Sequence, residues 1–363
     1  MQHTATPSDA INGVVPARRV QRQSTLTRMG RWARRATFLV HRWLGIVLAL
    51  LMAIWAISGI VMMYVAFPET TDAERLSGLQ PLDLTACCAA EADGQPLLSF
   101  PELNAASIEM LGGAPVLHWQ GNDSGGMLRL TDGTTPPMTL DDAKSIAAAH
   151  MQRSTGATAP VEVTQMERDQ WTVYGRFRQH APLYKASFAD DAGTALYISG
   201  RDGIVIQDTN AHERFWNWLG AVPHWLYFTA FREIQPLWYN FVIYASVLGT
   251  FLTVTGIYIG LRQYGRGKRR IPYKGMAYWH HVTGLVFGIF TLLWVVSGLL
   301  SMNPWGWLEG KGAASEVEAL AGRAMDSDDL VAMVSALQAA SPGDAVKAEL
   351  AIQDGTAFAI LSD

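Results

Sequence analysis

The sequence predicts an α-helical membrane bundle of three spans that carries α+β modules outside the membrane. The first observation is three long apolar segments, 38–67, 237–261 and 280–302, each with roughly the 20 apolar residues that cross a bilayer. The second is a low charge content, since only 17% of the residues are charged against about 25% in soluble domains. The third is an uneven distribution of basic residues beside the spans. Together they indicate a multi-pass membrane protein rather than a soluble core of long helices.

Basic residues gather in a tail, 1–37, and in a loop, 262–279. The tail has seven arginines against one acid, and positions 262–274 hold six basic residues and no acid. If the spans alternate in direction, both stretches lie on the same side, which the positive-inside rule places in the cytoplasm. The segments 68–236 and 303–363 then lie outside, in a bacterial periplasm. We therefore expect a bacterial inner-membrane protein with a cytoplasmic amino terminus and a periplasmic carboxyl terminus.

The two outside segments have the pattern of α+β structure. Helical patterns with acidic starts, at 140–151 and 327–338, each precede strand-like alternation, at 161–177 and 346–361. Further strands with glycine turns are expected over 183–208. The chain is therefore interpreted as two units, each a span followed by an outer module, with the return span only in the first unit.

A shift of 239 residues places the first span on the third. It aligns six identical pairs: His41 with His280, Gly45 with Gly284, Trp55 with Trp294, Ser58 with Ser297, Gly59 with Gly298 and Met63 with Met302. At about 100° per residue, the histidine, the glycines, the tryptophan and the methionine fall on one stripe of each helix. Because both spans start in the cytoplasm, the two histidines lie at the same depth, as the two axial ligands of one haem require. Arg42, beside the first histidine, is a candidate partner for a haem propionate.

Other interpretations of these residues stay open. A histidine at the membrane edge can lie among lipid head groups, and glycines along a span can serve close helix packing. The repetition of the histidine in two spans favours ligation. His281 points about 100° away from His280 around the helix. Three roles stay open for it: a group behind the ligand, a ligand on another face of the helix, or an interfacial residue. His224, in "VPHWLYF", is either a third ligand or a chance histidine in an aromatic belt.

The remaining chemistry-bearing residues carry no visible site. Four histidines without partner spacing are interpreted as ordinary surface or core residues: His118, His150, His180 and His212. The adjacent Cys87 and Cys88 are interpreted as two incidental surface thiols, because a disulfide between neighbours makes a strained ring. A redox or metal role for the two cysteines is the alternative.

The spans resemble the PepSY-associated transmembrane family. The resemblance rests on "FLVHRWLGIVLALLMAIWAISGIVM", on "VPHWLYF" before a span ending "TGIYIGLRQYGR", and on "YWHHVTGLVFGIFTLLWVVSGLL", while the outer modules look like PepSY domains. It implies an iron-regulated inner-membrane protein in which His41, His280 and His224 hold b-type haem and ferric siderophores are reduced in the periplasm. Family members commonly have four spans, whereas this sequence ends at Asp363 before a fourth. An outer haem that depends on His224 is therefore expected to lack its partner.

The sequence leaves three functions to consider. Electron transfer through haem fits the absence of a nucleophile triad, Walker loop, zinc motif or Rossmann fingerprint, because the cofactor then supplies the chemistry. A membrane-anchored PepSY binding module without redox chemistry is the alternative, and a permease is disfavoured because the spans hold no carboxylate. The expected partners are the lipid bilayer, a ferric siderophore, and a cytoplasmic or membrane electron donor. The net charge of −4 suggests no nucleic-acid partner.

Overall fold

The computed structural model describes residues 25–363, apart from 86, 89–90, 93–94, 97, 99, 101–102, 122–124, 266–269, 311–313 and 341. Positions 1–24 of the predicted basic tail and 266–269 of the predicted basic loop therefore lie outside the described residues. The chain divides into two compact units, Met1–Leu48 with Leu248–Trp294 and Ala49–Val247 with Val295–Asp363. The described part of the first unit is helical, and the second unit holds the β-sheets.

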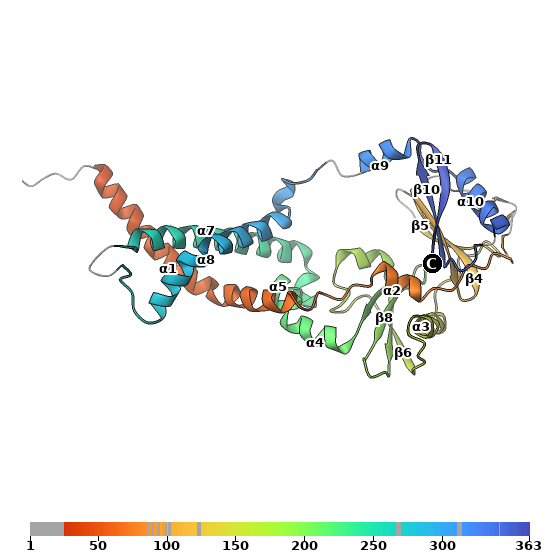
Figure 1. Ribbon diagram of the computed structural model, residues 1–363, viewed down its shortest axis with the longest axis horizontal. Coiled ribbons are helices and arrows are strands. Elements are labelled where there is room, and N and C mark those ends of the chain that lie inside the picture. The colour runs from red at the N-terminus through yellow and green to blue at the C-terminus, as the bar shows by residue number, and fades with distance from the viewer. Residues whose placement is uncertain are drawn as a thin grey trace, which may run out of the picture. The chain divides into compact units, whose positions relative to one another are not determined.

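Three helices carry the predicted apolar segments: α1 (Thr25–Met62), α7 (Gln235–Gln263) and α8 (Met276–Ser301) (Figure 1). With 38, 29 and 26 residues, each is long and apolar enough to cross a membrane. The first span was expected to reach Phe67, but α1 ends at Met62. Phe67 is instead buried in an aromatic cluster with Trp171 and Tyr174. Hydropathy alone cannot separate an apolar residue in a membrane from one in an adjoining protein core.

Within the first unit, the helices approach each other at glycines. A Cβ atom added at Gly260 or at Gly288 would lie 2.9 Å from a side chain of the facing helix, so alanine at either position would require that side chain to move. A Cβ at Gly45 would make only an ordinary 3.7 Å contact, and one at Gly284 would meet nothing within 4 Å. Close helix packing therefore involves glycines other than the two that follow the repeated histidines.

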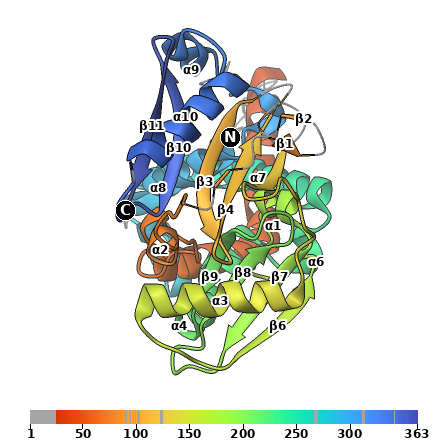
Figure 2. The same ribbon diagram turned by 90° about the vertical axis from the view of Figure 1, so that its right-hand side faces the viewer.

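A five-stranded antiparallel sheet of the second unit has the strand order β11-β10-β3-β4-β5. Its strands are β3 (Ala105–Leu111), β4 (Ala114–Gln120), β5 (Gly125–Arg129), β10 (Lys347–Gln353) and β11 (Thr356–Ser362). Helix α10 (Ser327–Ala340) covers one face of the sheet (Figure 2). Leu330, Met333 and Leu337 of this helix share a buried core with Ile108 and Leu117 of the sheet.

The carboxyl-terminal strands belong to the same sheet as strands that come more than 200 residues earlier in the chain. Ala348 of β10 is paired with Ile108 of β3. The sequence placed 303–363 in an outer module of its own, and this interpretation is corrected. Local alternation predicted the hairpin β10–β11, but it carries no information about which distant strand completes the sheet.

A four-stranded antiparallel sheet has the order β6-β7-β8-β9. Its elements are β6 (Val161–Met166), β7 (Leu183–Phe188), β8 (Ala195–Ser199), β9 (Val205–Thr209) and the covering helix α3 (Leu140–Thr155). Ala143, Ala147 and Met151 of α3 pack on Ala186 and Ile198. The turns expected before β8 and β9 contain Gly193 and Gly203, both with positive φ. The strand expected over 161–177 ends at Met166, because the aromatic residues beyond it turn into the cluster around Phe67.

Short elements connect these parts. They are α2 (Asp72–Ser77), β1 (Glu91–Ala92), β2 (Gln95–Pro96), η1 (Gly175–His180), α4 (Ala211–Leu219), α5 (Ala221–Trp225), α6 (Thr229–Arg232), η2 (Pro304–Gly306) and α9 (Ala314–Ala321). Cys87 and Cys88 form a disulfide with each other and are half-buried against the core under α10. The expectation of two incidental surface thiols is therefore corrected.

Helix α4 presents an exposed apolar face next to the end of α1. Its side chains Phe215, Trp218 and Leu219 are 60%, 49% and 49% exposed. A Cβ at Gly220, directly after α4, would lie 3.1 Å from Val61 of α1. The exposed aromatic side chains therefore lie on a helix that is packed against the end of an apolar helix.

Candidate functional site

The first unit brings together the two histidines that the repeat aligns. His41 of α1 and His280 of α8 have ring centroids 6.4 Å apart, with the ring planes tilted by 47°. His41 is half-buried, and His280 is exposed. The two residues are 239 positions apart in the chain, so their meeting is a property of the helix arrangement. The role of haem ligands remains a prediction.

A carbonyl group of the middle helix orients the His41 ring. Nδ1 of His41 lies 3.1 Å from the carbonyl oxygen of Leu252 and 3.2 Å from Oγ1 of Thr255, both on α7. A carbonyl oxygen can only accept, so Nδ1 carries the proton in this hydrogen bond and Nε2 keeps its lone pair. Histidines that bind metals commonly have this arrangement, in which a hydrogen bond at one nitrogen fixes the tautomer and directs the other toward the metal.

Gly256 makes room for the same ring. A Cβ atom at this position would lie 2.8 Å from Cε1 of His41. The repeat placed Gly45 and Gly284 on the histidine stripe of the first and third spans, and it did not point to Thr255 and Gly256 of the second span. The available signal was the Thr-Gly pair in "TGIYIG", the second-span counterpart of the Ser-Gly pairs in the first and third spans.

The separation of the two rings is close to that of two imidazoles bound to one metal ion. With metal–nitrogen bonds of about 2.0 Å and the nitrogen roughly 1.1 Å from its ring centre, two imidazoles on opposite sides of one metal have centroids about 6 Å apart. The observed 6.4 Å is close to this value. The donor set also fits, because His41 keeps Nε2 for a ligand and a side chain at Gly284 would meet open space. Among the described residues, no three His, Cys, Asp or Glu side chains are grouped as metal ligands, so this region offers a ligand pair rather than a cluster.

The other two predicted members of this site face elsewhere. His281 is buried, and its ring centroid lies 5.3 Å from that of Tyr273 with the ring planes tilted by 52°. Its Nε2 has no hydrogen-bond partner in the described part of the chain. The guanidinium of Arg42 is exposed and lies 5.8 Å from the centre of the Trp43 ring. The propionate contact proposed for Arg42 remains a prediction.

His224 contacts the second half of α1, within the second unit. Nδ1 of His224 lies 3.1 Å from the carbonyl oxygen of Trp55 and 3.2 Å from Oγ of Ser58. Ser58 is one of the residues that the repeat aligns, and it is 2% exposed. Burial lowers the pKa of His224, so the ring is neutral, as a metal ligand must be. The structure thus links the third candidate histidine to the repeated Ser-Gly pair, a connection that sequence spacing did not reveal.

Two histidines that were interpreted as ordinary, His118 and His150, line a cavity in the second unit. His180 is near this region, with Nδ1 3.3 Å from Oγ of Ser199. His212 is exposed on α4, and its ring centroid lies 6.3 Å from that of Trp216.

Comparison of the chain with models of protein families, with curated proteins and with solved structures finds no significant match.

Proposed function

We propose that this chain is a haem-binding electron-transfer protein of a bacterial inner membrane. The observation that carries the proposal is the approach of His41 and His280 to 6.4 Å, with Nδ1 of His41 held by the Leu252 carbonyl. Neither His41 nor His280 would need this arrangement in a protein that uses its helices only as an anchor. His41 and His280 would hold the iron, and Gly256 would keep the His41 ring in position.

Bound haem would supply one-electron redox chemistry. The protein's own contribution would be to orient the ligands, exclude water and set the reduction potential through burial and hydrogen bonding. The hydrogen bond from Nδ1 of His41 to the Leu252 carbonyl increases the basicity of Nε2. We infer from the resemblance to the PepSY-associated family that the electron acceptor is a ferric siderophore in the periplasm.

The exposed aromatic face of α4 supports a bilayer as the surroundings of the apolar helices. Tryptophan and other aromatic residues are enriched at the membrane–water interface, and α4 adjoins the end of α1. We propose that α4 lies in the periplasmic interface and that the amino terminus is cytoplasmic. Reporter fusions test the topology: a reporter that is active only in the cytoplasm should stay inactive after Met302, and activity there would overturn this arrangement.

The haem proposal is tested with the full chain purified from a membrane fraction. A pyridine haemochrome assay should give b-type haem, and His41→Ala and His280→Ala should each lose most of it. His281→Ala should lose less, and His212→Ala, an exposed histidine outside the site, should bind as much haem as the unaltered chain. A colourless unaltered protein would overturn the proposal in favour of a binding module. Full haem in His280→Ala together with loss in His281→Ala would overturn the ligand assignment.

A further inference from the structure

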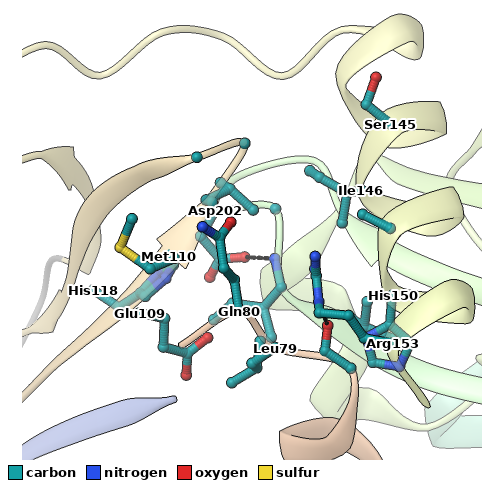
Figure 3. Close-up of a pocket in the computed structure, with 18 residues that line it drawn as sticks. Leu79, Gln80, Glu109, Met110, His118, Ser145, Ile146, His150, Arg153 and Asp202 are labelled. Atoms are coloured by element: carbon teal, nitrogen blue, oxygen red, sulfur yellow. Dashed lines mark hydrogen bonds between the residues drawn. The ribbon is translucent and has the colours of Figure 1, made fainter. Parts of the chain in front are cut away.

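A cavity of about 220 Å³ lies in the second unit, among four segments that are distant in sequence. Its walls come from the residues that follow α2, from the end of β3 with its turn, from one face of α3 and from the turn between β8 and β9 (Figure 3). The cavity is smaller than the roughly 300 to 1,000 Å³ of sites for drug-sized ligands, so it suits a small molecule.

One of the two carboxylates at this cavity already has cationic partners. Glu109 is 4% exposed and is bonded at 2.8 Å by Nη1 of Arg75, with Nζ of Lys347 at 4.0 Å. The carboxylate of Asp202 lies 3.9 Å from Nδ1 of His180, but burial lowers the pKa of this histidine and its ring is neutral. The negative charge of Glu109 is therefore balanced by cations of the protein, whereas Asp202 has only a neutral neighbour.

Arg153 is a solvent-exposed cation that lines the cavity. Its Nε donates a hydrogen bond to the carbonyl oxygen of Gly78 at 2.8 Å, which fixes the guanidinium at the cavity wall. Among the described residues, no carboxylate lies within ion-pair distance of this guanidinium. Figure 3 shows Arg153 on the α3 side of the cavity and His118 on the opposite side.

His118 provides a second polar group without a partner. Its Nδ1 is buried and has no hydrogen-bond partner in the part of the chain that the structure describes. Burial lowers the pKa of His118, so its ring is neutral and can donate one N–H to a ligand. Buried polar atoms are normally satisfied, so the unpartnered Nδ1 of His118 is unusual.

The rest of the wall is largely apolar, with Leu79, Met110, Leu111, Ile146 and Val205 among its residues. We propose that this cavity binds a small monocarboxylate with a short apolar body, whose carboxylate pairs with Arg153 while the body lies against the apolar wall. A guanidinium binds a carboxylate through two parallel hydrogen bonds, a geometry that favours this anion over a neutral or cationic head group.

The test is isothermal titration of the full chain in nanodiscs with hexanoate. Hexanoate should bind, whereas hexan-1-ol and hexylamine, which have the same body with a neutral or a cationic head, should bind at least about tenfold more weakly. Inorganic phosphate, an anion without the body, should also be weak. Equal affinity for hexanoate and hexan-1-ol, or tighter binding of phosphate, would overturn the proposal.

Arg153→Gln should weaken hexanoate binding by at least about tenfold, and Arg153→Lys should fall between this variant and the unaltered chain. Lys144→Gln is the matched control, because Lys144 is exposed on the same helix and does not line the cavity. Unchanged affinity in Arg153→Gln, or an equal loss in Lys144→Gln, would contradict the assignment. Haem content, measured on the same samples, should not change in either variant. Failure of this proposal is therefore distinguishable from failure of the proposed electron-transfer function.

Discussion

Replacing Gly256 by alanine should disturb the candidate haem site without removing either histidine. The added methyl group would lie 2.8 Å from Cε1 of His41, about 1 Å closer than an ordinary carbon–carbon contact of roughly 3.5 to 4.0 Å. A shift of the ring by that distance breaks the 3.1 Å hydrogen bond from Nδ1 to the Leu252 carbonyl. Loss of such an orienting bond typically lowers metal affinity 10- to 100-fold, which corresponds to about 1.4 to 2.8 kcal/mol.

The assay is titration of haem into the purified apoprotein, followed by the Soret band. Gly260→Ala is the matched control on the same helix, because its Cβ would lie 2.9 Å from Leu285 rather than from His41. We expect Gly256→Ala to lose haem affinity by at least about tenfold and Gly260→Ala to keep it within about twofold. Equal affinities for the Gly256→Ala and unaltered proteins, or a larger loss in Gly260→Ala, would refute the role given to this contact.

Three further predictions concern the second unit. Burial lowers the pKa of His150 from 6.5 to about 4, and the charges of two nearby arginines act in the same direction, so the folded state favours the neutral ring. The free energy of unfolding that depends on His150 is fully present above pH 6.5 and falls by up to about 3 kcal/mol as the pH is lowered toward 4. Amide exchange of α3 should show this loss in the unaltered chain and a smaller loss in His150→Gln. Asp329→Asn should destabilise α10 by about 1 to 3 kcal/mol, because Asp329 accepts two hydrogen bonds from Arg323, and unchanged amide protection of α10 would refute this. Brominated lipids should quench Trp218 if α4 lies in the interface, so Trp218→Phe should reduce the quenched fraction of tryptophan fluorescence, whereas Trp119→Phe in β4 should not.

Local patterns in the sequence were sufficient to predict the apolar helices and several strands. The spans follow from uninterrupted apolar runs. The strands β7 to β9 and the hairpin β10–β11 follow from alternation bounded by turn residues such as Gly193 and Gly203. The strands β3 to β5 were missed, and so was the pairing of β10 with β3, because a strand's partner is chosen by burial of a shared face across more than 200 residues.

The sequence predicted only part of the candidate site. The repeat identified His41 and His280 because two copies of one span keep the same residue at the same depth. It could not identify Leu252, Thr255 or Gly256, because they lie on a helix outside the repeat and act through a carbonyl oxygen, a hydroxyl group and the lack of a side chain. The cavity at Arg153 was equally invisible, since four segments that are distant in sequence form its walls.

The central claim is that His41 and His280 together hold one haem iron. Electron paramagnetic resonance of the oxidised, haem-loaded protein tests this claim most directly, because two imidazole ligands give a low-spin ferric signal and a single one gives a high-spin signal. We predict a low-spin signal in the unaltered chain and in His281→Ala, and a high-spin signal in whatever haem His280→Ala retains. A low-spin signal that persists in His280→Ala and disappears only in His281→Ala or His224→Ala would contradict the account.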